Sequence, residues 1–277
     1  FDIMNKFFKL NKLILQTFFL YIFILTNSSM SLEKYYEGDS VSNYFSGVIS
    51  LQDNKYKDSY EFFKTLENLE DNHSIFSKSY IETLVNNSKI NEAFRYSNKL
   101  KKKGMSFFLS DIVIISKFIK NGNFNKANNY FDSIENRKYT PLQELISQII
   151  FSWVKVEESK LNYSEALEVF ELINPRYNNI KRINNVFLNC YFDTTNTETK
   201  FKKLVNDKNT DFSRYVFFYA NYLLKKDLAK KANLVLSANL IDAPRNLLLN
   251  QFYLDIQQNK PNHLKNHFDC KNVSNII

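Results

Sequence analysis

Glycine and proline are scarce in this chain, with four of each among 277 residues. Folds built on sheets, such as β-barrels, β-sandwiches and doubly wound α/β domains, need many turns with positive φ, which glycine adopts most readily. The shortage therefore argues against a sheet and favours helices joined by short polar turns. Aromatic residues make up 16% of the chain, so phenylalanine and tyrosine fill many of its apolar positions.

The residues that most catalytic and metal sites need are also few. Three histidines are present, and none stands in a pattern typical of a nucleophile and its base. His263 and His267 are one helical turn apart, but Leu264 replaces the glutamate of a metalloprotease, so surface histidines are favoured over a zinc site. Cys190 and Cys270 lack metal-ligand spacing and are interpreted as partly buried thiols rather than a disulfide framework. No glycine-rich phosphate loop occurs, and we expect no catalytic residue, cofactor or metal.

The charge balance is basic but mixed. The formal net charge is +8, yet acidic residues alternate with basic ones, and only six of the 37 basic residues are arginine. Proteins that bind nucleic acids gather basic side chains on one face and favour arginine for planar contacts. The pattern therefore predicts solvated helix faces and no nucleic-acid partner.

A repeat of fixed length organises the middle of the chain. Phe124, Ala127 and Ile134 recur at helical spacing and share one face. Stepping back 34 residues from Ala127 reaches Ala93, and 34 more reach Ser59. A constant period with a small residue at one place is the sequence signature of a helical repeat.

The same pattern extends in both directions, with further small residues at Ala166 and Ala232 and with Lys200 at the corresponding place in a degenerate pair. Two antiparallel helices approach closely where a small side chain lies between them, and the aromatic residue four positions later would fill the remaining gap. Trp153 is expected to anchor a longer helix as a core residue. The expected helices cover residues 41–52, 56–69, 74–87, 90–102, 107–121, 124–135, 140–160, 163–173, 184–191, 197–204, 215–224, 228–236, 246–256 and 262–269.

The N-terminal region has the composition of a targeting segment. Residues 1–31 combine Lys6, Lys9 and Lys12 with an apolar run over residues 13–25. That run is shorter than the ~20 residues that span a bilayer, so a secretory signal peptide is preferred, with an uncleaved N-terminal anchor left open. Residues 32–39 are expected to be a linker and residues 40–277 to be repeats. The apolar ending at Ile276 and Ile277 suggests repeats that continue beyond the chain end.

These features resemble the tetratricopeptide repeat (TPR) family: a 34-residue helix-turn-helix period, glycine or asparagine in the turn, an aromatic residue three positions before the small residue and another four after it. Gly47 and Pro244 stand where that family places its glycine and proline. With the N-terminal segment included, the chain is similar to the N-terminal part of alphaproteobacterial envelope TPR proteins. The resemblance implies a right-handed superhelical solenoid of antiparallel helix pairs in the periplasm or outside the cell. It also implies a non-catalytic scaffold whose concave groove binds a peptide or partner protein.

In such a solenoid the first helix of each pair lines the groove. The family's carboxylate clamp uses lysine and asparagine where Tyr44 and Val48 stand in this chain, so that clamp is not expected. The surface carries both signs of charge, and an alternative is that several of its residues pack between helices. The groove residues that the resemblance implies are Tyr44, Lys78, Glu82, Ile112, Ser116, Arg214, Phe217 and Asn221.

Two other functions remain open at this point. The basic run of residues 100–105 has a pentatricopeptide character, which would make the chain an RNA-binding repeat protein. The 34-residue step and the secretory N-terminus favour the scaffold instead. The chain could also be the substrate-recruiting arm of an enzyme whose catalytic domain lies outside this sequence. Membrane contact is expected only through an uncleaved N-terminal segment.

Overall fold

The computed structural model describes residues 38–66, 69–71, 73–242, 246–258 and 268–277. Within these ranges the chain is helical and contains no strand, so the predicted all-α class is confirmed. The predicted targeting segment of residues 1–31, the histidines of residues 263 and 267, and the proline of residue 244 lie outside the described residues. Residues 38 and 39 of the expected linker already belong to the first described helix.

Consecutive helices form pairs, and the two helices of each pair pack on one another. The helix expected at residues 184–191 begins six residues earlier, and residues 268 and 269 of the last expected helix are not helical. The helices of the pairs are α2 (Gly38–Gln52) and α3 (Tyr56–Phe63), α4 (Ser74–Asn86) and α5 (Ile90–Lys102), α6 (Phe108–Lys120) and α7 (Phe124–Ile134), α8 (Pro141–Glu158) and α9 (Tyr163–Glu171), α10 (Asn178–Tyr191) and α11 (Thr197–Val205), and α12 (Val216–Lys225) and α13 (Ala229–Asp242). They are followed by α14 (Leu247–Gln257) and the short α16 (Val273–Ile276).

The turn inside every one of these pairs has the same backbone geometry. One residue in each turn has a positive φ, and the amide that follows it donates to a carbonyl five residues earlier, as in a Schellman motif. In the α6–α7 turn, for example, Gly122 has φ 69° and the Asn123 amide donates to the Phe118 carbonyl at 2.9 Å. The left-handed residues of the six turns are Asn54, Ser88, Gly122, Lys160, Asp193 and Asp227. The turn geometry therefore repeats although its sequence does not.

The small residues mark the closest approach between helices. Ser59, Ala93, Ala127, Ala166 and Ala232 have no exposed surface. The helices α2 and α3 approach closely as well, because a Cβ on Gly47 would lie 2.4 Å from the Phe63 ring. Their burial confirms the packing role predicted from the 34-residue period.

The predicted position of the small residue in α11 is wrong. Lys200 lies 34 residues after Ala166 but is exposed, whereas Thr197 has no exposed surface. The Thr197 hydroxyl donates to the Asn189 carbonyl at 2.8 Å, which allows a polar side chain in this contact. Phe201 follows Thr197 by four residues and is fully buried, in the same relation as Phe131 to Ala127. The step shortens to 31 residues here, so a fixed count overshoots the position.

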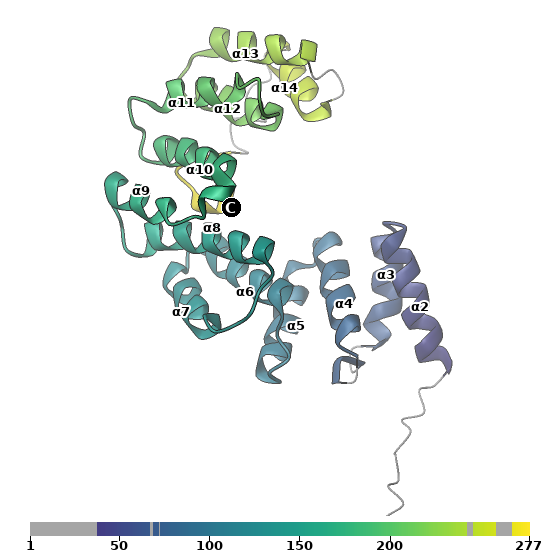
Figure 1. Cartoon of the computed structure of the whole chain (residues 1–277). Helices are drawn as coiled ribbons and strands as arrows, with labels where there is room; N and C mark the ends of the chain where they lie inside the picture. Colours follow the sequence, from purple (N-terminus) through teal and green to yellow (C-terminus); the bar gives the residue numbers. More distant parts are fainter. Residues whose placement is uncertain (1–37, 67–68, 72, 243–245, 259–267) are drawn as a thin grey trace, which may run out of the picture.

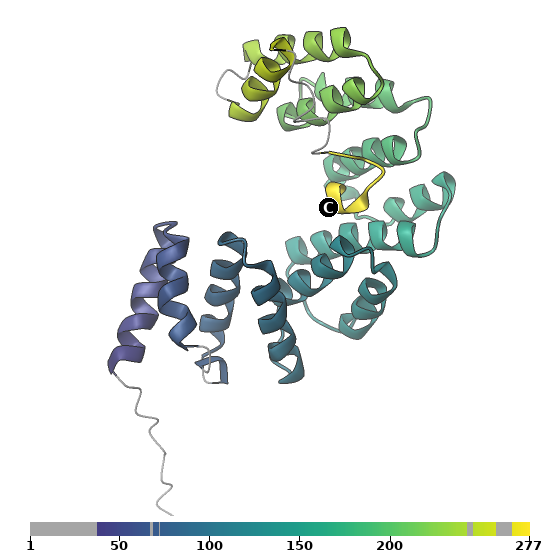
Figure 2. The ribbon, with the colours of Figure 1, turned by 180° about the vertical axis from the view of Figure 1, so that it is seen from behind.

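The first helices of neighbouring pairs also contact each other. The helix α2 packs on α4, α4 packs on α6, and α12 packs on α14. We call the surface built by these first helices, α2, α4, α6, α8, α10 and α12, the first-helix face. The pairs follow one another along an open arc, with α2 and α3 at one end and α13 and α14 at the other (Figures 1 and 2).

The two cysteines are joined, which corrects their interpretation as thiols. Cys190 in α10 and Cys270 near the C-terminus form a disulfide across 80 residues of sequence. They are 2% and 8% exposed, so the expected burial is present but the free thiols are not. No short-range spacing marks such a bond, because its two ends meet only once α10 to α14 are folded.

Candidate functional site

The residues predicted for the groove occupy different environments on the first-helix face. Lys78 and Glu82 on α4, Ser116 on α6 and Arg214 just before α12 are exposed. Tyr44 on α2 and Ile112 on α6 are half-buried, and the Tyr44 ring lies 4.7 Å from the His73 ring. Phe217 and Asn221 on α12 are buried among the helices.

Part of the first-helix face is covered by the chain itself. We call residues 268–277 the C-terminal segment. Its Phe268 ring lies 4.7 Å from Phe218 of α12 and 5.8 Å from Phe187 of α10. Its Asp269 carboxylate lies 3.3 Å from the Lys225 ammonium of α12. The disulfide to Cys190 adds a covalent bond to α10.

The end of the C-terminal segment reaches two further first helices. The helix α16 contacts α6 and α8, its Val273 side chain is buried, and Ile276 packs against the same apolar cluster. The segment therefore touches α6, α8, α10 and α12, which are all first helices of their pairs. In both views it lies in the bend of the arc beside α10 (Figures 1 and 2).

A hollow remains on the N-terminal side of this segment. We call it the α4–α6 hollow; its volume is about 670 Å³. It brings together two predicted groove residues, Lys78 and Glu82, and places them beside the aromatic rings of Phe107, Phe108 and Tyr139. The Lys78 ammonium lies 5.9 Å from the centre of the Phe107 ring. Charges of both signs next to aromatic rings suit a peptide side chain better than a single small anion.

A buried carboxylate holds the wall of the α4–α6 hollow in place. Asp111 of α6 is 1% exposed and pairs with the Arg137 guanidinium from the loop that follows α7. Its carboxylate also accepts hydrogen bonds from the Tyr130 hydroxyl at 2.8 Å and the Tyr139 hydroxyl at 3.0 Å. A buried charge is tolerated when it is paired and hydrogen-bonded in this way. The loop that carries Arg137 and Tyr139 is thereby fixed against α6.

The same network changes the acidity of its tyrosines. Burial, followed by the negative charge of Asp111 and the hydrogen bond to it, raises the pKa of Tyr139 to about 12. Burial and the hydrogen bond to Asp111 also raise the pKa of Tyr130 well above its usual range. Both hydroxyls therefore act as hydrogen-bond donors at neutral pH, which excludes them as general bases there.

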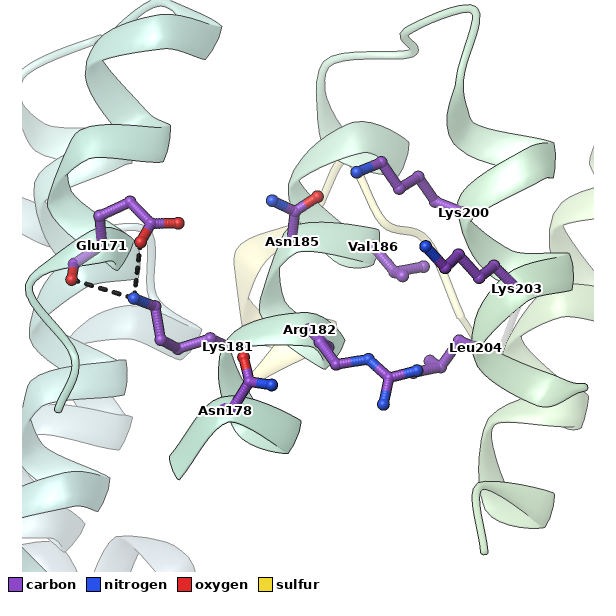
Figure 3. Close-up of a pocket in the computed structure, with 9 residues that line it drawn as sticks. All are labelled: Glu171, Asn178, Lys181, Arg182, Asn185, Val186, Lys200, Lys203 and Leu204. Atoms are coloured by element: carbon purple, nitrogen blue, oxygen red, sulfur yellow. Dashed lines mark hydrogen bonds and ion pairs between the residues drawn. The ribbon is translucent and has the colours of Figure 1, made fainter. Parts of the chain in front are cut away.

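A second, basic hollow of about 230 Å³ lies between α9, α10 and α11 (Figure 3). Its floor is the stripe of α10 formed by Asn178, Lys181, Arg182 and Asn185, and its walls carry Glu171 on one side and the lysines of α11 on the other. On the helix this stripe is roughly opposite Phe187 and Cys190, given ~100° per residue. The basic hollow and the C-terminal segment therefore use opposite sides of α10.

The cations of this basic hollow are only partly neutralised. Lys181 pairs with Glu171 at 2.6 Å, and Arg182 pairs with Asp207 at 2.5 Å. Lys200 and Lys203 form no ion pair with a carboxylate of the described residues. The surplus of positive charge would attract an anion, but both lysines are exposed and mobile side chains of this kind select weakly.

The sequence did not single out the residues that hold the C-terminal segment. Phe187, Cys190, Phe218 and Lys225 make its contacts, whereas Phe217 was predicted to line the groove. Phe217 and Phe218 differ by ~100° around the helix, so a shift of one residue separates a buried ring from one that meets the segment. A run of two phenylalanines gives no signal that separates them.

No protein-family model matches this chain, and a search of curated proteins found no similar sequence. Among the described residues there is no group of three or more histidine, cysteine or acidic side chains placed to hold a metal ion. Within the same part of the chain, every helix is too short or too polar to cross a bilayer.

Proposed function

We propose that this protein is a non-catalytic scaffold that binds a peptide or partner protein on its first-helix face. In this proposal the helix pairs form a TPR-like, right-handed superhelical solenoid, and the first-helix face is its concave groove. The α4–α6 hollow, with Lys78 and Glu82, serves as an anchoring point for a partner side chain.

The repeated architecture supports the TPR-like part of the proposal. Six successive pairs share the same Schellman turn, the same fully buried small residue in the second helix, and contacts between neighbouring first helices. A stack of pairs in contact mainly with their neighbours leaves an extended face rather than an enclosed pocket, and such faces bind extended partners.

The observation that carries the proposal is the seat of the C-terminal segment. This peptide-like stretch already lies against four first helices, with an aromatic ring, a carboxylate and aliphatic side chains each meeting a group on the face. A surface that accommodates one segment of polypeptide has the shape and the mixture of groups to accommodate another.

The disulfide supports a location outside the cytosol. Disulfides form and persist in oxidising compartments such as the bacterial periplasm, and they are rare in the cytosol. Together with the composition of residues 1–31, this favours a periplasmic or secreted protein over the RNA-binding alternative.

Site-specific photo-crosslinking in intact cells tests the proposal. A photoreactive amino acid replaces Glu82 or Ser116 on the first-helix face, and Asn129 on α7 serves as the exposed control position. We expect one discrete crosslinked partner from the two first-helix positions and none from the control. Equal crosslinking from all three positions, or recovery of the protein in the cytosol with bound RNA, would contradict the proposal.

A further inference from the structure

The C-terminal segment is held by three independent kinds of contact. Phe268 packs between Phe187 and Phe218, Asp269 pairs with Lys225, and Cys270 is bonded to Cys190. The short helix α16 has its own cap, because the Asn272 side chain accepts from the Ser274 amide at 3.0 Å. The segment is therefore a folded element seated on a surface.

Only one of these contacts is covalent and chemically reversible. The aromatic packing and the exposed ion pair are weak when the segment is free to move, since a surface ion pair contributes ~1 kcal/mol or less. The disulfide keeps the segment at a very high effective concentration against α10. Opening the bond therefore removes the main restraint that keeps any other polypeptide off this part of the first-helix face.

We infer that the surface under the C-terminal segment is a peptide-binding site that the segment occupies as a disulfide-latched internal ligand. This inference rests on the proposed function and names the chemistry of the partner. The seated side chains define it: an aromatic residue, an acidic residue directly after it, and aliphatic residues five and eight positions after the aromatic one, as in Phe268, Asp269, Val273 and Ile276. A partner with this spacing replaces the segment when the latch opens.

The latch opens by thiol–disulfide exchange with a dithiol reductant. One thiolate of the reductant attacks a sulfur of the disulfide, the bond between Cys190 and Cys270 breaks, and the second reductant thiol releases the mixed disulfide. The reductant becomes a disulfide, and the chain gains two electrons and two protons as two cysteine thiols. Cys270 is the more exposed of the two residues at 8%, so the attack is expected there and to be slow while the segment is seated.

Hydrogen–deuterium exchange on the full chain provides the first test, in the oxidised state and after treatment with dithiothreitol. We expect the amides of residues 268–277 to lose at least tenfold in protection on reduction, and the peptides of α10 and α12 to lose protection with them. The α2–α5 region should not change. If the C-terminal segment stays protected in the fully reduced chain, the inference is overturned whatever the variants below show.

Direct binding provides the second test. The probe is a fluorescent synthetic peptide of residues 268–277 with Cys270→Ser, and the receptor is the full chain carrying Phe268→Ala and Cys270→Ala, so that its own segment competes poorly. We expect at least tenfold tighter binding to this variant than to the oxidised wild-type chain. Lys225→Glu in the receptor should weaken binding several-fold because Asp269 loses its partner. Lys226→Ala is the matched control, since Lys226 pairs with Asp193 outside the segment.

The two proposals fail differently. If the peptide binds the opened chain but no cellular partner crosslinks at Glu82 or Ser116, the latched site stands and the scaffold function falls. If a partner crosslinks at those positions but the peptide does not bind the opened, folded chain, the C-terminal segment is only a structural brace and the inference falls alone. Circular dichroism of each variant establishes that its helices are intact.

Discussion

The first three helix pairs and the last three solve the same packing problem in different ways. In α2–α7 the buried small residues are spaced at 34 and 34, and two modest apolar clusters join each helix to its neighbours. In α8–α13 the spacings are 39, 31 and 35, and one large cluster extends from Leu145 of α8 to Val273 of the C-terminal segment. The disulfide lies only in this second half. Regular repeats close with local contacts, whereas the irregular half is closed by contacts between residues far apart in sequence.

The largest expected effect removes the long-range closure. Replacing Cys190 and Cys270 by alanine should lower the free energy of unfolding of the second half by about 4 kcal/mol, because a loop of 80 residues is no longer restricted in the unfolded chain. Trp153 is buried in the large cluster, where its indole donates to Asn184 at 2.9 Å, so its fluorescence reports that half. Hydrogen exchange of α2–α5 is the control. Equal loss of stability in both halves would show that the comparison is wrong.

A second pair of variants asks whether both halves depend on the same small-residue contact. Ala127→Leu in α7 and Thr197→Leu in α11 should each destabilise by about 1–3 kcal/mol through overpacking. Lys200→Leu, three residues after Thr197, should change stability by no more than about 0.5 kcal/mol because Lys200 is exposed. Urea unfolding measures all three. A large effect at Lys200 with none at Thr197 would reverse the corrected register.

Alkaline pH should weaken both halves through one tyrosine in each. The pKa of Tyr139 is raised to about 12 by burial and by Asp111, and that of Tyr191 to about 12 by burial and by Glu157. Tyrosine in the unfolded chain titrates near ~10, so the stabilisation is fully present below that pH and is lost as the pH rises towards 12. Unfolding midpoints measured across this window should fall. Tyr139→Phe should reduce the fall in the first half, and Tyr191→Phe in the second; an unchanged slope in either variant would contradict the assignment.

The smallest expected effect concerns the turns. Lys160 adopts φ 50° in the α8–α9 turn, where the corresponding residue of the α6–α7 turn is Gly122 with φ 69°. A side chain in the left-handed region is strained by ~1 kcal/mol, so Lys160→Gly should stabilise slightly and Gly122→Ala should destabilise by about the same amount. Thermal melting of the two variants gives the measurement. Shifts in the same direction would show that the two turns are not equivalent.

The sequence predicted what depends on local periodicity. The small residues Ala93, Ala127 and Ala166 and most helix boundaries follow from apolar spacing, because side chains three and four residues apart share a helix face. Thr197 was missed because the pair containing it is three residues shorter than the period. The turn conformation was missed because asparagine, serine, lysine and aspartate occupy left-handed positions that glycine usually marks.

The candidate site was harder to predict for a different reason. Lys78 and Glu82 were found because the register of α4 is regular, and they meet in the α4–α6 hollow. Their aromatic neighbour Tyr139 comes from a loop held by Asp111, and no local pattern links those two residues. The seat of the C-terminal segment depends on contacts across the whole second half. Single-sequence reasoning has no access to such pairings.

The bond between Cys190 and Cys270 has a mechanical consequence. A chain pulled from its two ends transmits force through the sulfur atoms and bypasses the 80 residues between them, so α11 to α14 carry no load. At ~3.5 Å per extended residue, about 280 Å of contour length stays hidden until the bond is reduced. Single-molecule stretching would therefore count the state of this one linkage as a step in length.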